Sequence, residues 1–60
     1  MIITHFENIL DIRADSIVID MPFPVRADDY VEIHGVSMLV VSTAWVIETG
    51  EHVKLVARVK

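Results

Sequence analysis

Glu32, His34 and His52 are the side chains whose types and spacing come nearest to a metal site. Glu32 and His34 lie two residues apart, so in an extended strand both point to the same face. With His52 from across the sheet, they would form a set of two histidines and one carboxylate that could bind a metal ion. The same spacing is common on solvated strand faces. We therefore expect a polar surface here, without a bound metal or other cofactor.

Two adjacent carboxylates, Asp28 and Asp29, are the best candidates for acid–base chemistry. Such chemistry needs carboxyl groups that face each other across a cleft, whereas neighbours in a turn diverge. Aspartate is also a common turn residue because it bonds to nearby backbone. No serine has the context of a nucleophile elbow, and the only glycines, Gly35 and Gly50, form no phosphate loop. We expect turn chemistry at the aspartates, no enzymatic activity and no small-molecule ligand.

Lys54, Arg58 and Lys60 form the one basic stripe, at alternate positions of the last predicted strand. Such a stripe can contact nucleic acid, with Trp45 or Tyr30 as a stacking platform. It can equally protect an edge strand from aggregation, or pair with the acidic residues of the first half of the chain. The net charge of −4 disfavours binding to phosphates. A small nucleic-acid-associated barrel is therefore the alternative function, and nucleic acid is not the partner that we expect.

The stretch 36–48 is rich in β-branched residues and apolar on both faces. Such a strand is either covered on both sides or curved across a barrel. If its even-numbered side chains face the core, a second apolar stripe consists of Leu39, Val41, Trp45 and Ile47. Tryptophan is enriched at interface hot spots, so these four are the interface candidates. The other interpretation is that they form the core and the opposite face is covered.

Hydrophobic periodicity elsewhere predicts about five strands and no long helix. The clearest strand is 52–60, which alternates strictly and forms a hairpin with 36–48 through a turn at 49–51. Shorter strands are predicted at 30–34, 16–21 and 2–7. The prolines at 22 and 24 end the second of these, because proline cannot donate to a ladder. A short helix through Phe6, Ile9 and Leu10 is the alternative near the start of the chain.

The segment from Pro24 to Val41 resembles the general pattern of small SH3-like barrels: a turn, a short apolar strand, a glycine turn and a longer strand. Asp28-Asp29 stands where such barrels usually have Gly-Asp. The predicted fold is all-β, a small SH3-like barrel or rolled antiparallel sheet of about five strands, dominated by the C-terminal hairpin (36–48/52–60). An open meander completed by a second subunit is the alternative. The resemblance carries no activity with it, because the family is functionally mixed.

Length and composition point towards an interface. Residues 1–60 make one small domain, which buries only roughly 60% of its unfolded surface. The chain is 53% hydrophobic and has no cysteine to form a disulfide. Apolar surface that the interior cannot hold usually marks an interaction site.

We therefore expect a non-enzymatic protein-interaction or assembly module that forms a homo-oligomer or binds a protein partner. Short, cysteine-free chains of this kind suit bacterial or phage accessory proteins, and the missing cysteine suits the cytoplasm. The first seven residues have neither a basic start nor a long apolar run, so we expect no signal peptide and no membrane partner.

Overall fold

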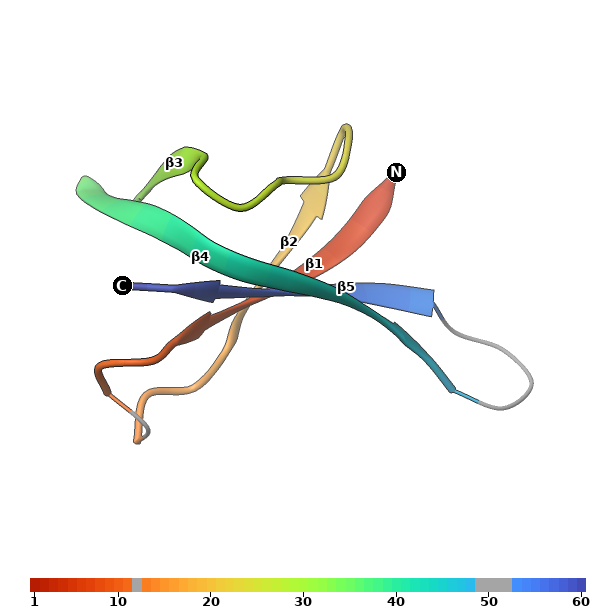
Figure 1. The fold of residues 1–60 in the computed structure, drawn as a ribbon, viewed down its shortest axis with the longest axis horizontal. Helices are drawn as coiled ribbons and strands as arrows, with labels where there is room; N and C mark the ends of the chain where they lie inside the picture. Colours follow the sequence, from red (N-terminus) through yellow and green to blue (C-terminus); the bar gives the residue numbers. More distant parts are fainter. Residues whose placement is uncertain (12, 49–52) are drawn as a thin grey trace.

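A computed structural model describes residues 1–11, 13–48 and 53–60, and in them the only regular elements are β-strands. The strands are β1 (Ile2–Asn8), β2 (Ile17–Met21), β3 (Tyr30–Ile33), β4 (Val36–Ile47) and β5 (Val53–Val59). They form one sheet in the order β2-β1-β5-β4-β3, which curls into a half-barrel (Figure 1). The predicted turn at 49–51 and the residue His52 lie outside the described residues. Among the residues that the structure describes, no helix has the length and apolarity to span a membrane.

The all-β, rolled, five-stranded fold predicted from the sequence is confirmed, and its first segment is a strand rather than a helix. One pairing departs from an antiparallel sheet, because β1 and β5 run parallel. The reason is geometric. Five successive strands that alternate in direction leave the first and the last pointing the same way. When the curled sheet brings these two together, they can only pair in parallel.

The β3–β4 connection is a two-residue turn between the paired residues Ile33 and Val36. Its central residues, His34 and Gly35, both have positive φ, at 51° and 80°. This is the geometry of a type I′ turn, whose twist matches that of the flanking strands. The predicted tight link at Gly35 is thus confirmed. It fixes which face of the sheet the first side chains of β4 take.

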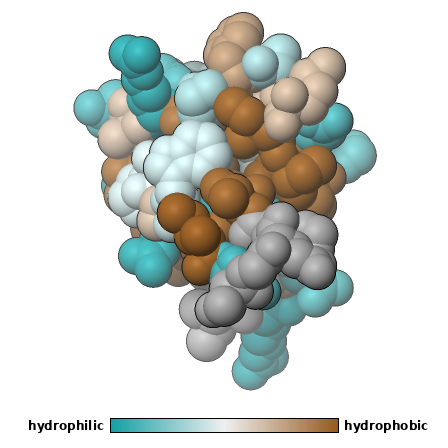
Figure 2. All heavy atoms as spheres, turned by 90° about the vertical axis from the view of Figure 1, so that its right-hand side faces the viewer, coloured by the Kyte–Doolittle hydropathy of each residue, from teal (hydrophilic) through white to brown (hydrophobic). Residues whose placement is uncertain are grey.

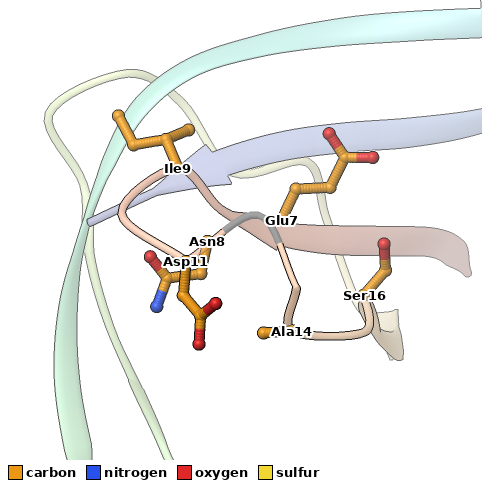
Figure 3. Close-up of a pocket in the computed structure, with 6 residues that line it drawn as sticks. All are labelled: Glu7, Asn8, Ile9, Asp11, Ala14 and Ser16. Atoms are coloured by element: carbon orange, nitrogen blue, oxygen red, sulfur yellow. The ribbon is translucent and has the colours of Figure 1, made fainter.

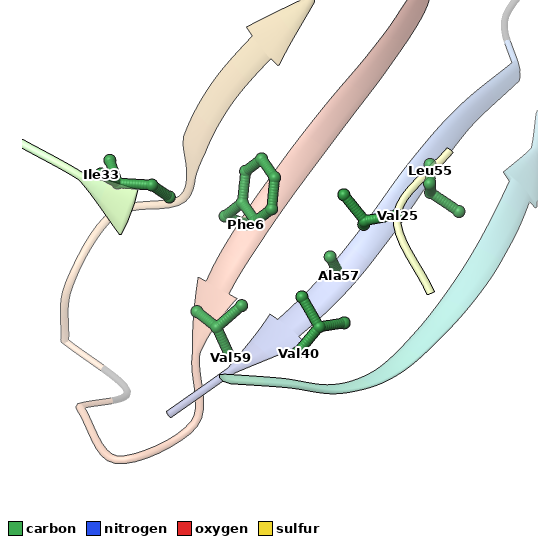
Figure 4. Close-up of a cluster of buried hydrophobic side chains, with 7 residues drawn as sticks. All are labelled: Phe6, Val25, Ile33, Val40, Leu55, Ala57 and Val59. Atoms are coloured by element: carbon green, nitrogen blue, oxygen red, sulfur yellow. The ribbon is translucent and has the colours of Figure 1, made fainter. Parts of the chain in front are cut away.

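The core lies on the concave face of the sheet. Its buried apolar side chains come from β1, β3, β4, β5 and the β2–β3 connection: Phe6, Val25, Ile33, Val40, Leu55, Ala57 and Val59. Figure 4 shows them gathered on the inside of the curved sheet. Val25 belongs to no strand and covers the middle of this face. The half-barrel is therefore closed locally by a connecting loop.

A β-bulge in β4 changes which side chains face the core. Val40 pairs with Val59, but the next pair on β5 is Ser42 with Arg58, so Val41 is an extra residue. One extra residue moves the following side chains to the opposite face. Beyond the bulge, Trp45 pairs with the buried Leu55 and so lies on the concave face.

The four interface candidates therefore do not form one stripe. Leu39 pairs with the exposed Tyr30 on the convex face. Val41 is the bulged residue, and Trp45 and Ile47 lie on the concave face with the core. The even-numbered side of β4 faces the core only as far as Val40.

Candidate interaction surface

The concave face has an apolar end that the rest of the chain leaves open. Trp45, Ile47 and Val53 are 52%, 74% and 56% exposed. Ile47 and Val53 are a cross-strand pair in line with the pair of Trp45 and the buried Leu55. We call these three exposed residues the open end. Figure 2 looks onto this side of the molecule and shows hydrophobic side chains gathered across its middle.

The open end continues the core rather than lying apart from it. Leu55, which is 1% exposed, and Val53 are two residues apart on the same face of β5. In the parallel pair, Thr4 is opposite Leu55, so the half-buried Ile2 falls opposite Val53. Val25 covers the middle of this face. A partner that sits on the open end would therefore extend an existing apolar core.

Beside the open end, β4 has an uncovered edge. On the side away from β5, β3 pairs only with Val36–Leu39. Val40 comes next and exchanges backbone hydrogen bonds with the loop at Asp28 and Asp29, at 2.8 Å each. Within the described residues, no strand lies beside 41–47 on that side. We call this segment the free edge of β4.

The direction of the backbone groups on the free edge follows from the ladder. Leu39 and Lys60 exchange two backbone hydrogen bonds, at 3.0 and 3.1 Å. In an antiparallel ladder, alternate residues of a strand bond towards the same neighbour. Every second residue of β5 before Lys60 therefore bonds to β4, and their partners beyond the bulge are Ser42, Ala44 and Val46. The N–H and C=O groups of the residues between them, Thr43, Trp45 and Ile47, point away from β5.

The free edge lacks the usual protection against pairing. Natural sheets block their edges with charges, proline or short strands. Residues 41–47 contain no charged residue, no proline and no glycine. The other edges of the sheet are shorter and carry acids, with Asp20 in β2 and Glu32 in β3. Among the strands of residues 1–11, 13–48 and 53–60, only β4 presents a long, uncharged edge next to exposed apolar side chains.

The basic stripe lies on the convex face. Arg58 pairs with Ser42 and Lys54 with Val46, on the side opposite the core. Acidic groups accompany it, since Lys54 Nζ is 3.8 Å from Glu48 Oε1 and Glu7 is level with Arg58 in the neighbouring strand. Trp45 is on the other face of the sheet. Trp45 is therefore separated from the stripe, whereas Tyr30, the other proposed stacking platform, is exposed on the convex face.

The possible metal ligands are not brought together in the described part of the chain. Glu32 lies exposed in β3, and His34 follows in the turn with a positive φ. His52 lies outside the described residues. No group of three histidine or acidic side chains within the described ranges could hold a metal ion.

The paired aspartates shape a turn. Asp29 Oδ2 accepts a hydrogen bond from the Arg26 backbone N–H at 2.9 Å, and Asp28 has a φ of 75°. The backbone N–H of Asp29 also donates to the Arg26 carbonyl at 3.1 Å. The predicted turn chemistry is thus confirmed for this pair.

A hollow lies near the end of β1, and another lies between β4 and β5 beside Glu7 and Arg58.

The residues around the hollow at β1 belong to the end of this strand and to the loop that follows it. The hollow is lined by Glu7, Asn8, Ile9, Asp11, Ala14 and Ser16 (Figure 3). Asn8 Oδ1 accepts from the Leu10 N–H at 2.9 Å and Asp11 Oδ1 from the Arg13 N–H at 3.1 Å. In Figure 3, the carboxylates of Glu7 and Asp11 point in different directions. These groups close the loop and do not converge on a ligand.

Comparison with known proteins found no matching family model, no matching curated protein and no matching solved structure.

Proposed function

We propose that this chain is a non-enzymatic assembly module that self-associates through the open end of its half-barrel. The observation that carries the proposal is the exposure of Trp45, Ile47 and Val53 on the same face as the buried core. We place it among cytoplasmic accessory proteins of bacteria or their phages, in keeping with its small size and lack of cysteine.

Stability supports association. Only seven apolar side chains are buried in the described core. A domain of this length is only marginally stable, and no disulfide is available to it. Covering the open end would remove further apolar surface from water, at roughly 25 cal/mol for each Å². Tryptophan at the centre of such a patch is typical of residues that dominate binding energy.

The test compares two charge insertions at equally exposed sites. Trp45→Glu places a carboxylate in the open end, whereas Val18→Glu places one on the convex face, where Val18 is 54% exposed. Size-exclusion chromatography at matched concentrations is expected to show a monomer for Trp45→Glu and an unchanged oligomer for Val18→Glu. Circular dichroism reports whether both variants keep the β-sheet. Equal elution of two folded variants would count against the proposal.

A nucleic-acid partner is the second candidate, because Lys54, Arg58 and Lys60 lie on the convex face. The nearby acids Glu7 and Glu48 and the net charge of −4 weaken it. Retention of single-stranded DNA in a gel shift at low salt, lost as salt rises, would support it. We expect no retention.

A further inference from the structure

Within the described part of the molecule, the free edge of β4 has a regular row of backbone N–H and C=O groups without a protein partner. The N–H and C=O groups of Thr43, Trp45 and Ile47 point away from β5, where no described strand lies. A protein partner that bonds to several of them in a row is an extended strand that pairs through its own backbone. A partner strand with apolar side chains on the concave side would also cover Trp45 and Ile47, which are more than half exposed there.

We propose that the occupant is the same edge of a second copy, so that two β4 strands pair antiparallel about a two-fold axis at Trp45. This inference rests on the proposed self-association and specifies its surface. A two-fold interface needs one self-complementary patch. An uncharged strand whose outward groups recur at every second residue is self-complementary when it is reversed.

The register follows from which residues point outward. With the axis at Trp45, Thr43 of each copy faces the partner's Ile47, and Trp45 faces the partner's Trp45. The backbone N–H and C=O groups of all three residues then form hydrogen bonds with the partner strand. An axis at Ala44 would set Ile47 against the bulged Val41, where the ladder is irregular, and only Thr43 and Trp45 would pair normally.

Charge complementarity favours this register. Glu48 would stand opposite the partner's Ser42, which pairs on its other side with Arg58 in β5. Two strand spacings separate the strands that carry Glu48 and Arg58, about 10 Å, which two long side chains can span. The symmetry creates this contact twice. Pairing through β2 would instead bring Asp20 of both copies to a shared edge in a chain of net charge −4.

The pairing would also join the two concave faces. Trp45, Ile47 and Val53 of each copy lie on that face beside the shared edge. The two open ends then border one another, with the pair of tryptophans between them. Because each copy uses the same edge, the contact is complete in a dimer and does not propagate into a fibre.

Paired cysteines test the register, since the chain has no cysteine of its own. Thr43→Cys with Ile47→Cys places thiols on residues whose Cα atoms would be about 5.5 Å apart across the axis, within disulfide range. Oxidised glutathione is expected to link this double variant into covalent dimers on a non-reducing gel. Either single variant should give less than about a tenth of that amount, since its thiol would face no thiol. The control, Ile17→Cys with Met21→Cys, tests the competing β2 edge while keeping Asp20, and should not link.

The unmodified chain supplies a second readout, because Trp45 is its only tryptophan. Two indoles side by side at the axis would give a coupled pair of far-ultraviolet circular dichroism bands that grows with protein concentration. A dimer by light scattering without these bands and without the 43–47 cross-link would overturn the β4 pairing alone, as would linkage of the β2 control. A monomer at every concentration would overturn the proposed self-association as well.

Discussion

Val53 and Leu55 occupy equivalent positions on the same face of β5, yet Leu55 is 1% exposed and Val53 is 56% exposed. The difference arises from what lies over them. Val25 covers the middle of the concave face, and the open end extends beyond it. Strict alternation in 53–59 correctly predicted which side chains face inward. It could not predict where the covering loop would stop, because that depends on a contact between residues far apart in the chain.

This contrast predicts the effects of truncation. Leu55→Ala should lower the free energy of unfolding by about 2–5 kcal/mol, because it leaves a cavity in a closely packed core. Val53→Ala at low protein concentration should change it by less than about 1 kcal/mol, because no packed cavity forms at an exposed site. Urea denaturation followed by circular dichroism measures both. Similar decreases in the free energy of unfolding for the two variants would mean that the assignment of Leu55 to the core is wrong.

At the scale of the elements, the sequence predicted the positions and inward-facing side chains of β2, β3 and β5 best. Their alternation is regular, and the glycine turn at 35 sets the phase of β4. The side-chain faces of β4 beyond residue 40 were wrong because nothing in its uniform β-branched pattern marks the bulge at Val41. The parallel pairing of β1 and β5 was also missed, since periodicity reports which face a residue takes and not which strands meet.

Proline scanning of β4 tests the direction of its backbone groups. Thr43→Pro removes an N–H that points away from β5, so the monomer should keep its fold while the oligomer weakens. Ala44→Pro removes an N–H that bonds to β5 and should destabilise the monomer by at least about 1 kcal/mol more than Thr43→Pro. Urea denaturation at low concentration and chromatography at high concentration separate the two effects. If Thr43→Pro lowered the free energy of unfolding more than Ala44→Pro, the directions assigned to the backbone groups of β4 would be wrong.

At the scale of the whole molecule, an open half-barrel is a domain with an unfinished side. The sheet presents an uncharged edge at residues 41–47 and an apolar end at Trp45, Ile47 and Val53. The composition predicted such an excess of apolar surface. The alternation of residues in 36–48 placed it in a stripe along β4. In the structure, part of that stripe lies on the convex face, and the surface lies instead where two strands and an open edge meet. Only the pairing of β4 with β5 places Val53 beside Ile47.

The molecular mass of the unmodified chain in solution tests self-association most directly. Light scattering across a wide range of protein concentrations is expected to show a mass that rises from that of one chain, 6.8 kDa, to twice that value. The rise should be complete at concentrations where Trp45→Glu still has the mass of one chain. A mass that stays at 6.8 kDa at every concentration would contradict the account.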